Sequence, residues 1–155
     1  MNADVLQAEL STDTYRAARL ADDLRRAYVD RGESFIFETV FSDPVGDKVD
    51  FLEDAARRGY TVLLCYIGIT GVELSVNRVA MRVFEGGHDV PRDKLRSRFP
   101  RTLENLRAAI RRLPRVLIYD NSDLAVPYRQ VAAFDHGQLQ SLAEPIPEWL
   151  RPLLP

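Results

Sequence analysis

The sequence contains little of the chemistry that marks secreted, metal-binding or membrane-spanning proteins. It has one cysteine, Cys65, and two histidines, so it offers neither a disulfide framework nor a metal motif with ligand spacing. No apolar run approaches the length that crosses a bilayer, and the N-terminal residues lack the apolar segment of a signal peptide. We therefore expect a cytoplasmic domain with no membrane partner. Because Cys65 stands in an apolar run, we also expect a buried structural thiol.

An excess of positive charge is also missing. The formal net charge is −2 at pH 7, whereas domains that bind nucleic acid are commonly basic. We expect no nucleic-acid partner, and any binding site for anions must be local. With 155 residues and 46% hydrophobic composition, the chain can bury one good core.

Positive charge is concentrated in one stretch, residues 78–106. Arg78 and Arg82 are one turn apart in a predicted helix that ends at a Gly-Gly turn. Arginine stays charged and binds phosphate oxygens in pairs, so the stretch fits polyphosphate binding. A solvated helix surface is the alternative, because most charged residues on helices are exposed. A second predicted helix after the turn adds Arg92, Arg96, Arg98 and Arg101.

Helical and strand-like segments alternate along the first three quarters of the chain. Continuous apolar strands between amphipathic helices predict an α/β fold with a three-layer, mainly parallel sheet. Pro100 should kink or divide the helix in which it falls. The expected helices run from a cap at Ser11 or Thr12 to about Arg31, from Asp47 to Arg58, from near Gly71 onward, and from Leu95 to Ile110. The expected strands are Phe35–Phe37, Tyr60–Ile67 and Val116–Tyr119.

The C-terminal part follows another pattern. Residues 129–134 and 138–140 predict a hairpin at the sheet edge, turned at His136-Gly137. A proline-rich tail follows, in which Trp149 is expected to pack onto the body of the protein because an indole contributes a large buried area. We expect one domain over residues 1–141 and a packed tail over residues 142–155.

Several short motifs occur in a fixed order. They are NAD at Asn2–Asp4, RGESFIFETVFS at Arg31–Ser42, RGYTVLLCYIG at Arg58–Gly68, the pair RVAMRV and GGHDVP, and YDNS at Tyr119–Ser122. The ordered set resembles the zeta-toxin-like ATPases and kinases, a branch of the P-loop kinase superfamily. The resemblance covers about four fifths of the chain and implies a sheet of the P-loop-kinase type.

One hallmark of that family is not found in the sequence. Family members carry a strand and a GxxxxGK[ST] loop shortly before the NAD segment, and no such loop occurs here. A P-loop holds phosphates with its backbone N–H groups and its lysine. The sequence is therefore either part of a longer protein or a degenerate member of the family. Without the P-loop strand, a gap in the sheet should leave the chain marginally stable or self-associating.

The resemblance implies roles for residues at the acceptor side. Asp4 matches the family's base, which accepts the proton of the hydroxyl that receives the phosphoryl group. Glu38 and Thr39 match the positions that contact the substrate, and a carboxylate there can accept hydrogen bonds from sugar hydroxyls. Val40 stands where nucleotide-sugar kinases have a threonine, which leaves the acceptor open.

The resemblance also implies a lid that contacts ATP. Arg82 matches the arginine that meets the phosphates, and Arg78 is a weaker match one turn earlier. His88 stands where the second lid arginine is expected, and Arg96 or Arg98 can supply that charge. ATP and Mg²⁺ are the implied cofactors of an intact family member.

Three functions are consistent with these observations. The first is ATP-dependent phosphoryl transfer to a hydroxyl, for example of UDP-N-acetylglucosamine, with this chain inactive alone. The second is a non-catalytic interaction module or a toxin–antitoxin remnant, and the third is an ATPase-like regulator without a sugar substrate. The expected partners are a small-molecule substrate, an antitoxin protein, and a second copy of the chain at the sheet gap.

Overall fold

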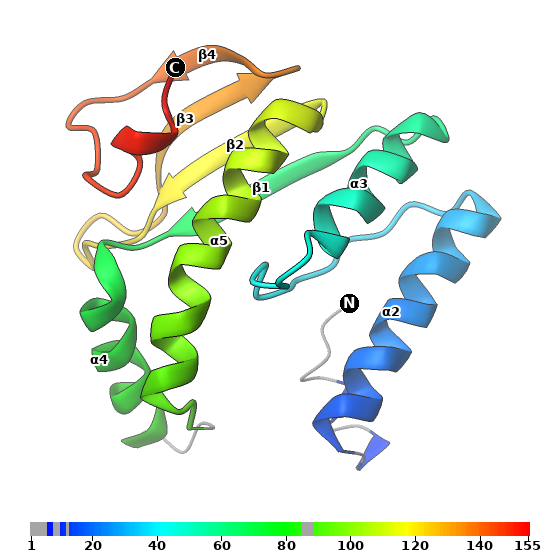
Figure 1. The fold of residues 1–155 in the computed structure, drawn as a ribbon, viewed down its shortest axis with the longest axis horizontal. Coiled ribbons are helices and arrows are strands. Elements are labelled where there is room, and N and C mark those ends of the chain that lie inside the picture. Colours follow the sequence, from blue (N-terminus) through cyan, green and yellow to red (C-terminus); the bar gives the residue numbers. More distant parts are fainter. Residues whose placement is uncertain (1–5, 8–9, 12, 85–88) are drawn as a thin grey trace. The chain divides into compact units, whose positions relative to one another are not determined.

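The computed structural model describes residues 6–7, 10–11, 13–84 and 89–155. The chain divides into two compact units, Met1–Val40 and Phe41–Pro155. Figure 1 shows the order of the elements along the chain.

The first unit is built on one long helix, α2, which spans Thr14–Arg31. The Asp13 carboxylate accepts a hydrogen bond from the Arg16 backbone N–H at 2.9 Å, which satisfies one of the free donors at the start of the helix. The cap is therefore Asp13, and the predicted cap at Ser11 is wrong. The other predicted cap, Thr12, lies outside the described residues.

An extended segment turns back after α2 at Gly32, whose φ of 70° favours glycine. Its aromatic rings contact the helix: Phe35 stacks on Tyr28 with centroids 5.3 Å apart, and the Arg25 guanidinium lies 4.9 Å from the centroid of Phe37. The predicted strand at residues 35–37 is wrong, because this segment has no strand assignment in the described structure. Contacts with α2 take the place of pairing in a sheet.

The second unit contains a four-stranded sheet in the order β1-β2-β3-β4. Strands β1 and β2 pair in parallel, from Leu63 opposite Arg115 to Gly68 opposite Asp120. The other two pairings, β2 with β3 and β3 with β4, are antiparallel, so the predicted mainly parallel sheet is wrong. The predicted edge hairpin is confirmed as β3 and β4. The strands span Leu63–Gly68, Arg115–Asp120, Arg129–Asp135 and Gln138–Leu142.

Direct pairing of β1 with β2 removes the gap expected for an absent central strand. The gap prediction is therefore wrong for this sheet. Strand β1 is an edge strand among the described strands, and an unpaired edge can accept another strand. Self-association stays a prediction, with the open edge of β1 in place of a gap as the surface involved.

Three helices complete the second unit. Helices α3 (Asp47–Arg57), α4 (Gly71–Phe84) and α5 (Arg92–Arg112) confirm the predicted helical segments. Helix α5 runs through Pro100 without being divided. The Gly86-Gly87 stop predicted for α4 lies outside the described residues.

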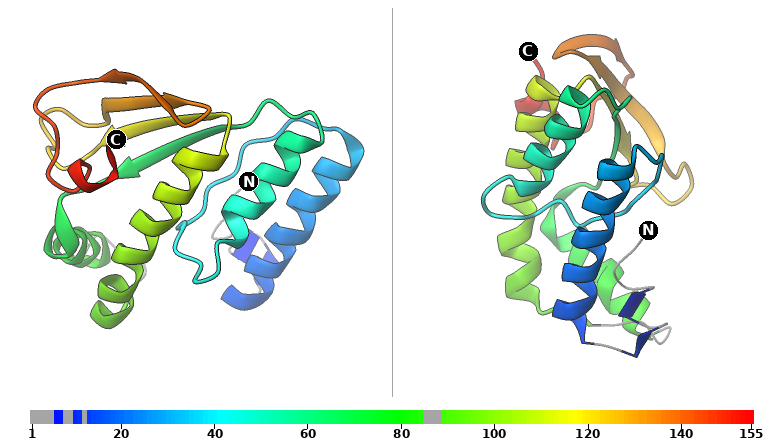
Figure 2. Two further views of the ribbon diagram at one scale, coloured as in Figure 1. Left: turned by 45° about the horizontal axis from the view of Figure 1, so that its top comes forward. Right: turned by 90° about the vertical axis from the view of Figure 1, so that its right-hand side faces the viewer.

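The core lies between α5 and one face of the sheet, and Figure 2 shows α5 running along that face. The tail adds a short 3₁₀ turn, Arg151–Leu153, and its Trp149 is only 7% exposed. The predicted packing of Trp149 onto the body of the protein is therefore observed. The largest fully buried side chains of this core are Phe134, Leu106, Leu113, Ile118, Leu150, Val49, Val116 and Val131.

The opposite face of β1 is open. Leu63 and Ile67 are 51% and 53% exposed, and Cys65 between them is also exposed. The predicted buried thiol is wrong, because alternate residues of a strand face opposite sides and only one side of β1 meets the core. A second helical layer is not seen among the described residues of this unit, so the three-layer arrangement is not confirmed.

A buried asparagine fastens the start of this unit to α5. The Asn105 amide donates to the carbonyl oxygens of Phe41 at 3.1 Å and Asp43 at 3.0 Å. Phe41 is itself buried and has a φ of 59°, an uncommon value for a residue other than glycine. The asparagine therefore satisfies two carbonyl groups that an irregular segment leaves without partners in a helix or strand.

A charged cluster joins α3 to α5. The Arg112 guanidinium donates to Asp50 at 2.6 Å and, through Nε, to Glu53 at 2.9 Å. The hydrogen bond from Arg112 lowers the pKa of Glu53 below its ordinary value, and Arg57 contributes in the same direction. Ionised Glu53 is thus the form that the folded protein favours.

This pKa shift predicts a pH-dependent contribution to stability. Because the folded-state pKa of Glu53 is lowered, its contribution is present above the unfolded-state pKa and is lost as the pH falls through the folded-state pKa. We expect Glu53→Gln to reduce the free energy of unfolding near neutral pH, and the difference from wild type to shrink in acid. Urea unfolding at a series of pH values measures it, with the exposed Glu104→Gln as control. A difference independent of pH would contradict the linkage.

Candidate functional site

The carboxyl ends of β1 and β2 meet at one edge of the sheet because the two strands are parallel. The Asn121 backbone N–H donates to the Gly68 carbonyl at 2.9 Å and fixes the turn after β2 against the end of β1. In open α/β sheets, ligands bind in the crevice outside the carboxyl ends of strands. The residues that follow these two strands are therefore the first candidates for a site.

Two hydroxyl groups join these turns. The Thr70 N–H donates to Ser122 Oγ at 2.8 Å, and the two hydroxyl oxygens lie 2.9 Å apart. Ser122 Oγ in turn lies 2.6 Å from Asp120 Oδ1. A serine hydroxyl has one proton, and an ionised carboxylate can only accept. The Ser122 proton therefore goes to Asp120, and the Thr70 hydroxyl donates to Ser122.

An arginine from α4 reaches the same turn. Arg78 Nη2 donates to the Ser122 carbonyl at 3.2 Å. Its Nε is buried and has no hydrogen-bond partner within the described part of the chain. A buried donor without an acceptor is rare in folded proteins and often indicates an unseen water or ion. A water molecule or an anion would supply the acceptor that this donor lacks.

Trp149 of the C-terminal tail and Arg129 of β3 both lie close to the Asp120 carboxylate. The Trp149 indole N–H donates to Asp120 Oδ1 at 3.1 Å, and Arg129 Nη2 lies 4.0 Å from Asp120 Oδ2. The Trp149 ring also lies 6.0 Å from Tyr66, measured between centroids. Burial raises the pKa of the Tyr66 phenol, so this ring stays neutral and forms an apolar neighbour of the strand ends.

The structure places only some of the predicted residues at this edge. Arg78 is there. Arg96 instead pairs with Glu73 at 3.3 Å, linking α5 to α4 at the surface. Arg82 is exposed one turn beyond Arg78 on α4. The predicted phosphate ligand His88 lies outside the described residues, so its role stays a prediction.

The predicted acceptor-side residues belong to the other unit. Glu38 and Thr39 are exposed near the end of the first unit and follow no strand. Because the strand predicted at residues 35–37 is not formed, neither residue lies at a strand end, and their match to the family positions stays a prediction. The predicted base, Asp4, lies outside the described residues.

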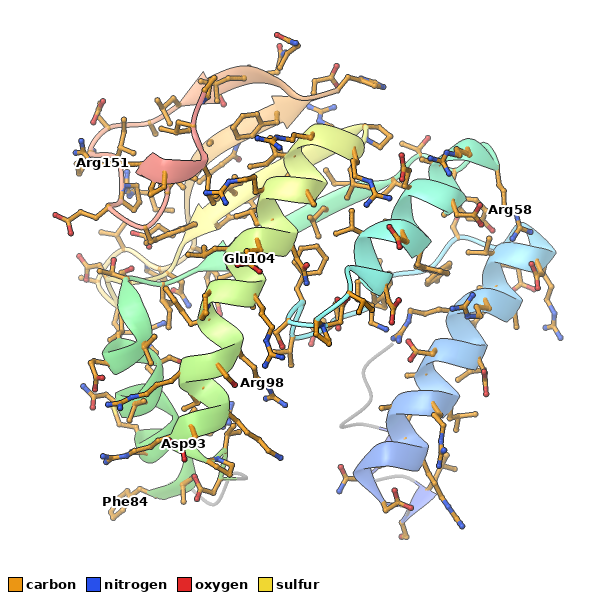
Figure 3. All side chains as sticks on the ribbon, in the orientation of Figure 1. Arg58, Phe84, Asp93, Arg98, Glu104 and Arg151 are labelled. Atoms are coloured by element: carbon orange, nitrogen blue, oxygen red, sulfur yellow. The ribbon has the colours of Figure 1, made fainter. Side chains whose placement is uncertain are left out.

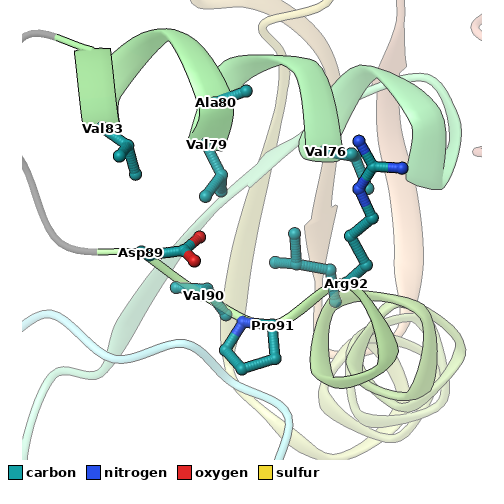
Figure 4. Close-up of a pocket in the computed structure, with 9 residues that line it drawn as sticks. Val76, Val79, Ala80, Val83, Asp89, Val90, Pro91 and Arg92 are labelled. Atoms are coloured by element: carbon teal, nitrogen blue, oxygen red, sulfur yellow. The ribbon is translucent and has the colours of Figure 1, made fainter.

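A separate pocket of about 310 Å³ lies between α4 and the start of α5. Figure 4 shows the Asp89 and Arg92 side chains at this pocket, facing valines of α4. Phe84, at the end of the same helix, extends into solvent (Figure 3) and is 94% exposed. This predominantly apolar lining does not suit a polyphosphate, so the strand-end site remains the candidate. The lining residues are Val76, Val79, Ala80, Val83, Asp89, Val90, Pro91, Arg92 and Leu95.

The turn after β2 belongs to the YDNS motif, but its residues were not predicted as site residues. Asp120 and Ser122 belong to the YDNS motif, whose position after a buried strand could have marked them as site residues. Thr70 could have been found from the short turn that follows the preceding strand. Trp149 gave no such signal, because only the packed tail brings its indole to Asp120.

Within residues 6–7, 10–11, 13–84 and 89–155, no group of three or more carboxylate, histidine or cysteine side chains is placed to hold a metal ion. In the same ranges, no helix is both long and apolar enough to cross a membrane.

Comparison with known families supports an assignment. A family model described as Zeta toxin matches residues 2–132 of the chain. The chain belongs to the Zeta toxin family. Membership of the Zeta toxin family gives it a kinase-like or toxin-related function, in agreement with the ordered motifs. The matched stretch includes Thr70, Arg78, Asp120 and Ser122 and ends before Trp149. No curated protein and no solved structure matches the chain.

Proposed function

We propose that this chain serves ATP-dependent phosphoryl transfer to a hydroxyl group, with a nucleotide sugar such as UDP-N-acetylglucosamine as the acceptor. One observation supports the proposal above the others: the buried Nε of Arg78 lacks an acceptor at the carboxyl ends of two parallel strands. A phosphate oxygen would supply that acceptor, and a guanidinium group suits it in charge and geometry.

The described residues have distinct parts in this proposal. Arg78 binds and orients a phosphate group, because the Ser122 carbonyl already fixes its guanidinium. The Thr70 hydroxyl donates to Ser122 and keeps its own lone pairs for a further donor. Asp120 holds the Ser122 hydroxyl in the orientation that makes this arrangement stable.

The remaining roles rest on family resemblance. Asp4 acts as the base, Glu38 and Thr39 hold the acceptor, and Arg82, His88 and Arg96 neutralise phosphate charge. Bound ATP with Mg²⁺ would supply the transferable phosphoryl group. An antitoxin protein as partner and a cytoplasmic location belong to the same proposal.

Because the sequence has no P-loop, we predict weak nucleotide binding and no kinase turnover by this chain. A P-loop supplies many of the backbone donors that hold ATP phosphates. We expect Mg·ATP to bind at best with a dissociation constant of about 1 mM, equivalent to about 4 kcal/mol of binding free energy. Calorimetry and NMR titration of the full chain measure it.

The same titration tests the site. Added Mg·ATP should shift the NMR signals of the Arg78 Nε–H and the Thr70 amide, and Arg78→Gln should abolish the response at Thr70. Arg111→Gln, an exposed change near the far end of α5, is the matched control. Low-micromolar binding would contradict the predicted weak affinity. An unchanged Arg78 signal at saturating nucleotide would overturn the site.

A further inference from the structure

The C-terminal tail reaches the candidate site although it lies beyond the stretch that matches the Zeta toxin family. The Trp149 indole is 7% exposed, and its N–H donates to Asp120 Oδ1 at 3.1 Å. The same oxygen accepts the Ser122 hydroxyl. One carboxylate oxygen thus joins the tail to the turn that carries Ser122.

Packing fixes the indole in this position. A Cβ atom added to Gly68 would lie only 2.4 Å from two ring carbons of Trp149, so the ring rests directly on the end of β1. The Trp149 ring also lies beside the Tyr66 ring, and the two ring centroids are 6.0 Å apart. An indole held in this way can direct its N–H at one acceptor, and here that acceptor is Asp120.

The tail also holds Arg129, which lies near the second oxygen of the Asp120 carboxylate. Arg129 donates to the backbone carbonyls of Glu144 at 3.4 Å and Pro145 at 2.8 Å, both in the tail. Its Nη2 lies 4.0 Å from Asp120 Oδ2. Both oxygens of Asp120 therefore face donors whose positions depend on the tail.

We infer that Trp149 is a positioning residue for the phosphate site, acting through Asp120 on Ser122, whose carbonyl accepts the hydrogen bond from Arg78. This inference rests on the proposed function of that site. A carboxylate fixed by the indole takes the only proton of Ser122, which leaves the Ser122 lone pairs for the Thr70 N–H and hydroxyl. Loss of the indole N–H frees Asp120 to turn and releases the Ser122 hydroxyl. The anion-binding edge then loses its fixed geometry, although the core can remain folded.

The test is Trp149→Phe in the full chain, which keeps an aromatic ring in the core but removes the N–H donor. We expect the Thr70 and Ser122 amide signals to shift in the unliganded protein. Affinity for Mg·ATP and for inorganic phosphate should fall about tenfold, the scale of one hydrogen bond to a charged group. The single indole N–H signal of wild type should move on Asp120→Asn, because Trp149 is the one tryptophan of the chain.

Leu153→Ala is the matched control, since Leu153 is a buried tail residue that does not contact Asp120 through a hydrogen bond. It should lower the melting temperature while leaving the Thr70 signal and the affinities near wild type. Equal losses of affinity in both variants would overturn the inference, as would wild-type Thr70 and Ser122 signals in Trp149→Phe. If Trp149→Phe does not fold, Asp120→Asn decides, and an unmoved indole signal there would overturn the inference. If the wild-type protein binds neither Mg·ATP nor inorganic phosphate, the proposed function is refuted. The Thr70 and Ser122 amide signals of the unliganded protein still decide the role of Trp149.

Discussion

Gly68→Ala should destabilise the protein by about 3 kcal/mol, because overpacking a buried position commonly costs up to this amount. The added Cβ would lie 2.4 Å from two atoms of the Trp149 ring, a distance that real Cβ atoms essentially never show. A rigid ring cannot yield as the end of a flexible side chain can. The strand end cannot move freely either, because the Gly68 carbonyl accepts the Asn121 N–H at 2.9 Å. Urea unfolding monitored by circular dichroism measures the loss.

Cys65→Ala is the control on the same strand. Cys65 is exposed on the opposite face of β1, so its removal should change the free energy of unfolding by less than about 0.5 kcal/mol. A double-mutant cycle identifies the cause of the loss. If the clash with the indole is responsible, Gly68→Ala should cost much less in a Trp149→Leu background. Strictly additive losses would show that the indole is not the obstacle.

The contact between Gly68 and Trp149 illustrates which parts of the fold could be predicted from the sequence. Helices α2 to α5 and the β3–β4 hairpin follow from local periodicity and turn residues, and the structure confirms them. The packing of Trp149 follows from the large apolar area of an indole. Its hydrogen bond to Asp120 does not, because the two residues meet only after the tail has folded over the end of β1.

The wrong predictions share a physical cause. Burial of Cys65 and a mainly parallel sheet both assumed that β1 lies inside the sheet with both faces covered. An apolar run in a strand does not determine which strands pair with it, and among the described strands β1 lies at the edge with one open face. The predicted strand at residues 35–37 failed for a related reason, because its rings pack on α2.

The candidate site, like the fold, could be predicted only in part. Helical spacing and the family resemblance selected Arg78, which the structure places at the strand ends. Thr70 and Ser122 become neighbours through the parallel pairing of β1 with β2, and that register is a long-range property. The role of Arg78 as a phosphate ligand stays a prediction, and the hydroxyl groups near it were not predicted from the sequence.

Arg82→Ala should lower turnover by roughly two to three orders of magnitude in a version of the protein extended with a P-loop strand, loop and helix. That is the usual loss when one preorganised donor to the transition state is removed. Arg82 is an exposed residue on α4. Val76 on the same helix is buried and holds the helix in place. The substitution should therefore change the free energy of unfolding by less than about 0.5 kcal/mol. Steady-state phosphoryl transfer and thermal melting measure the two effects.

Comparison with two other arginines separates a lid from a solvated surface. Arg78→Ala removes the guanidinium that is hydrogen-bonded to the Ser122 carbonyl, so it should reduce both turnover and stability. Arg111→Ala, an exposed change near the end of α5, should affect neither. Loss of turnover without loss of stability is thus the signature of Arg82 alone among the three. If Arg82→Ala behaves like Arg111→Ala, the arginine belongs to a solvated helix face and the phosphate contact is confined to the Arg78 edge.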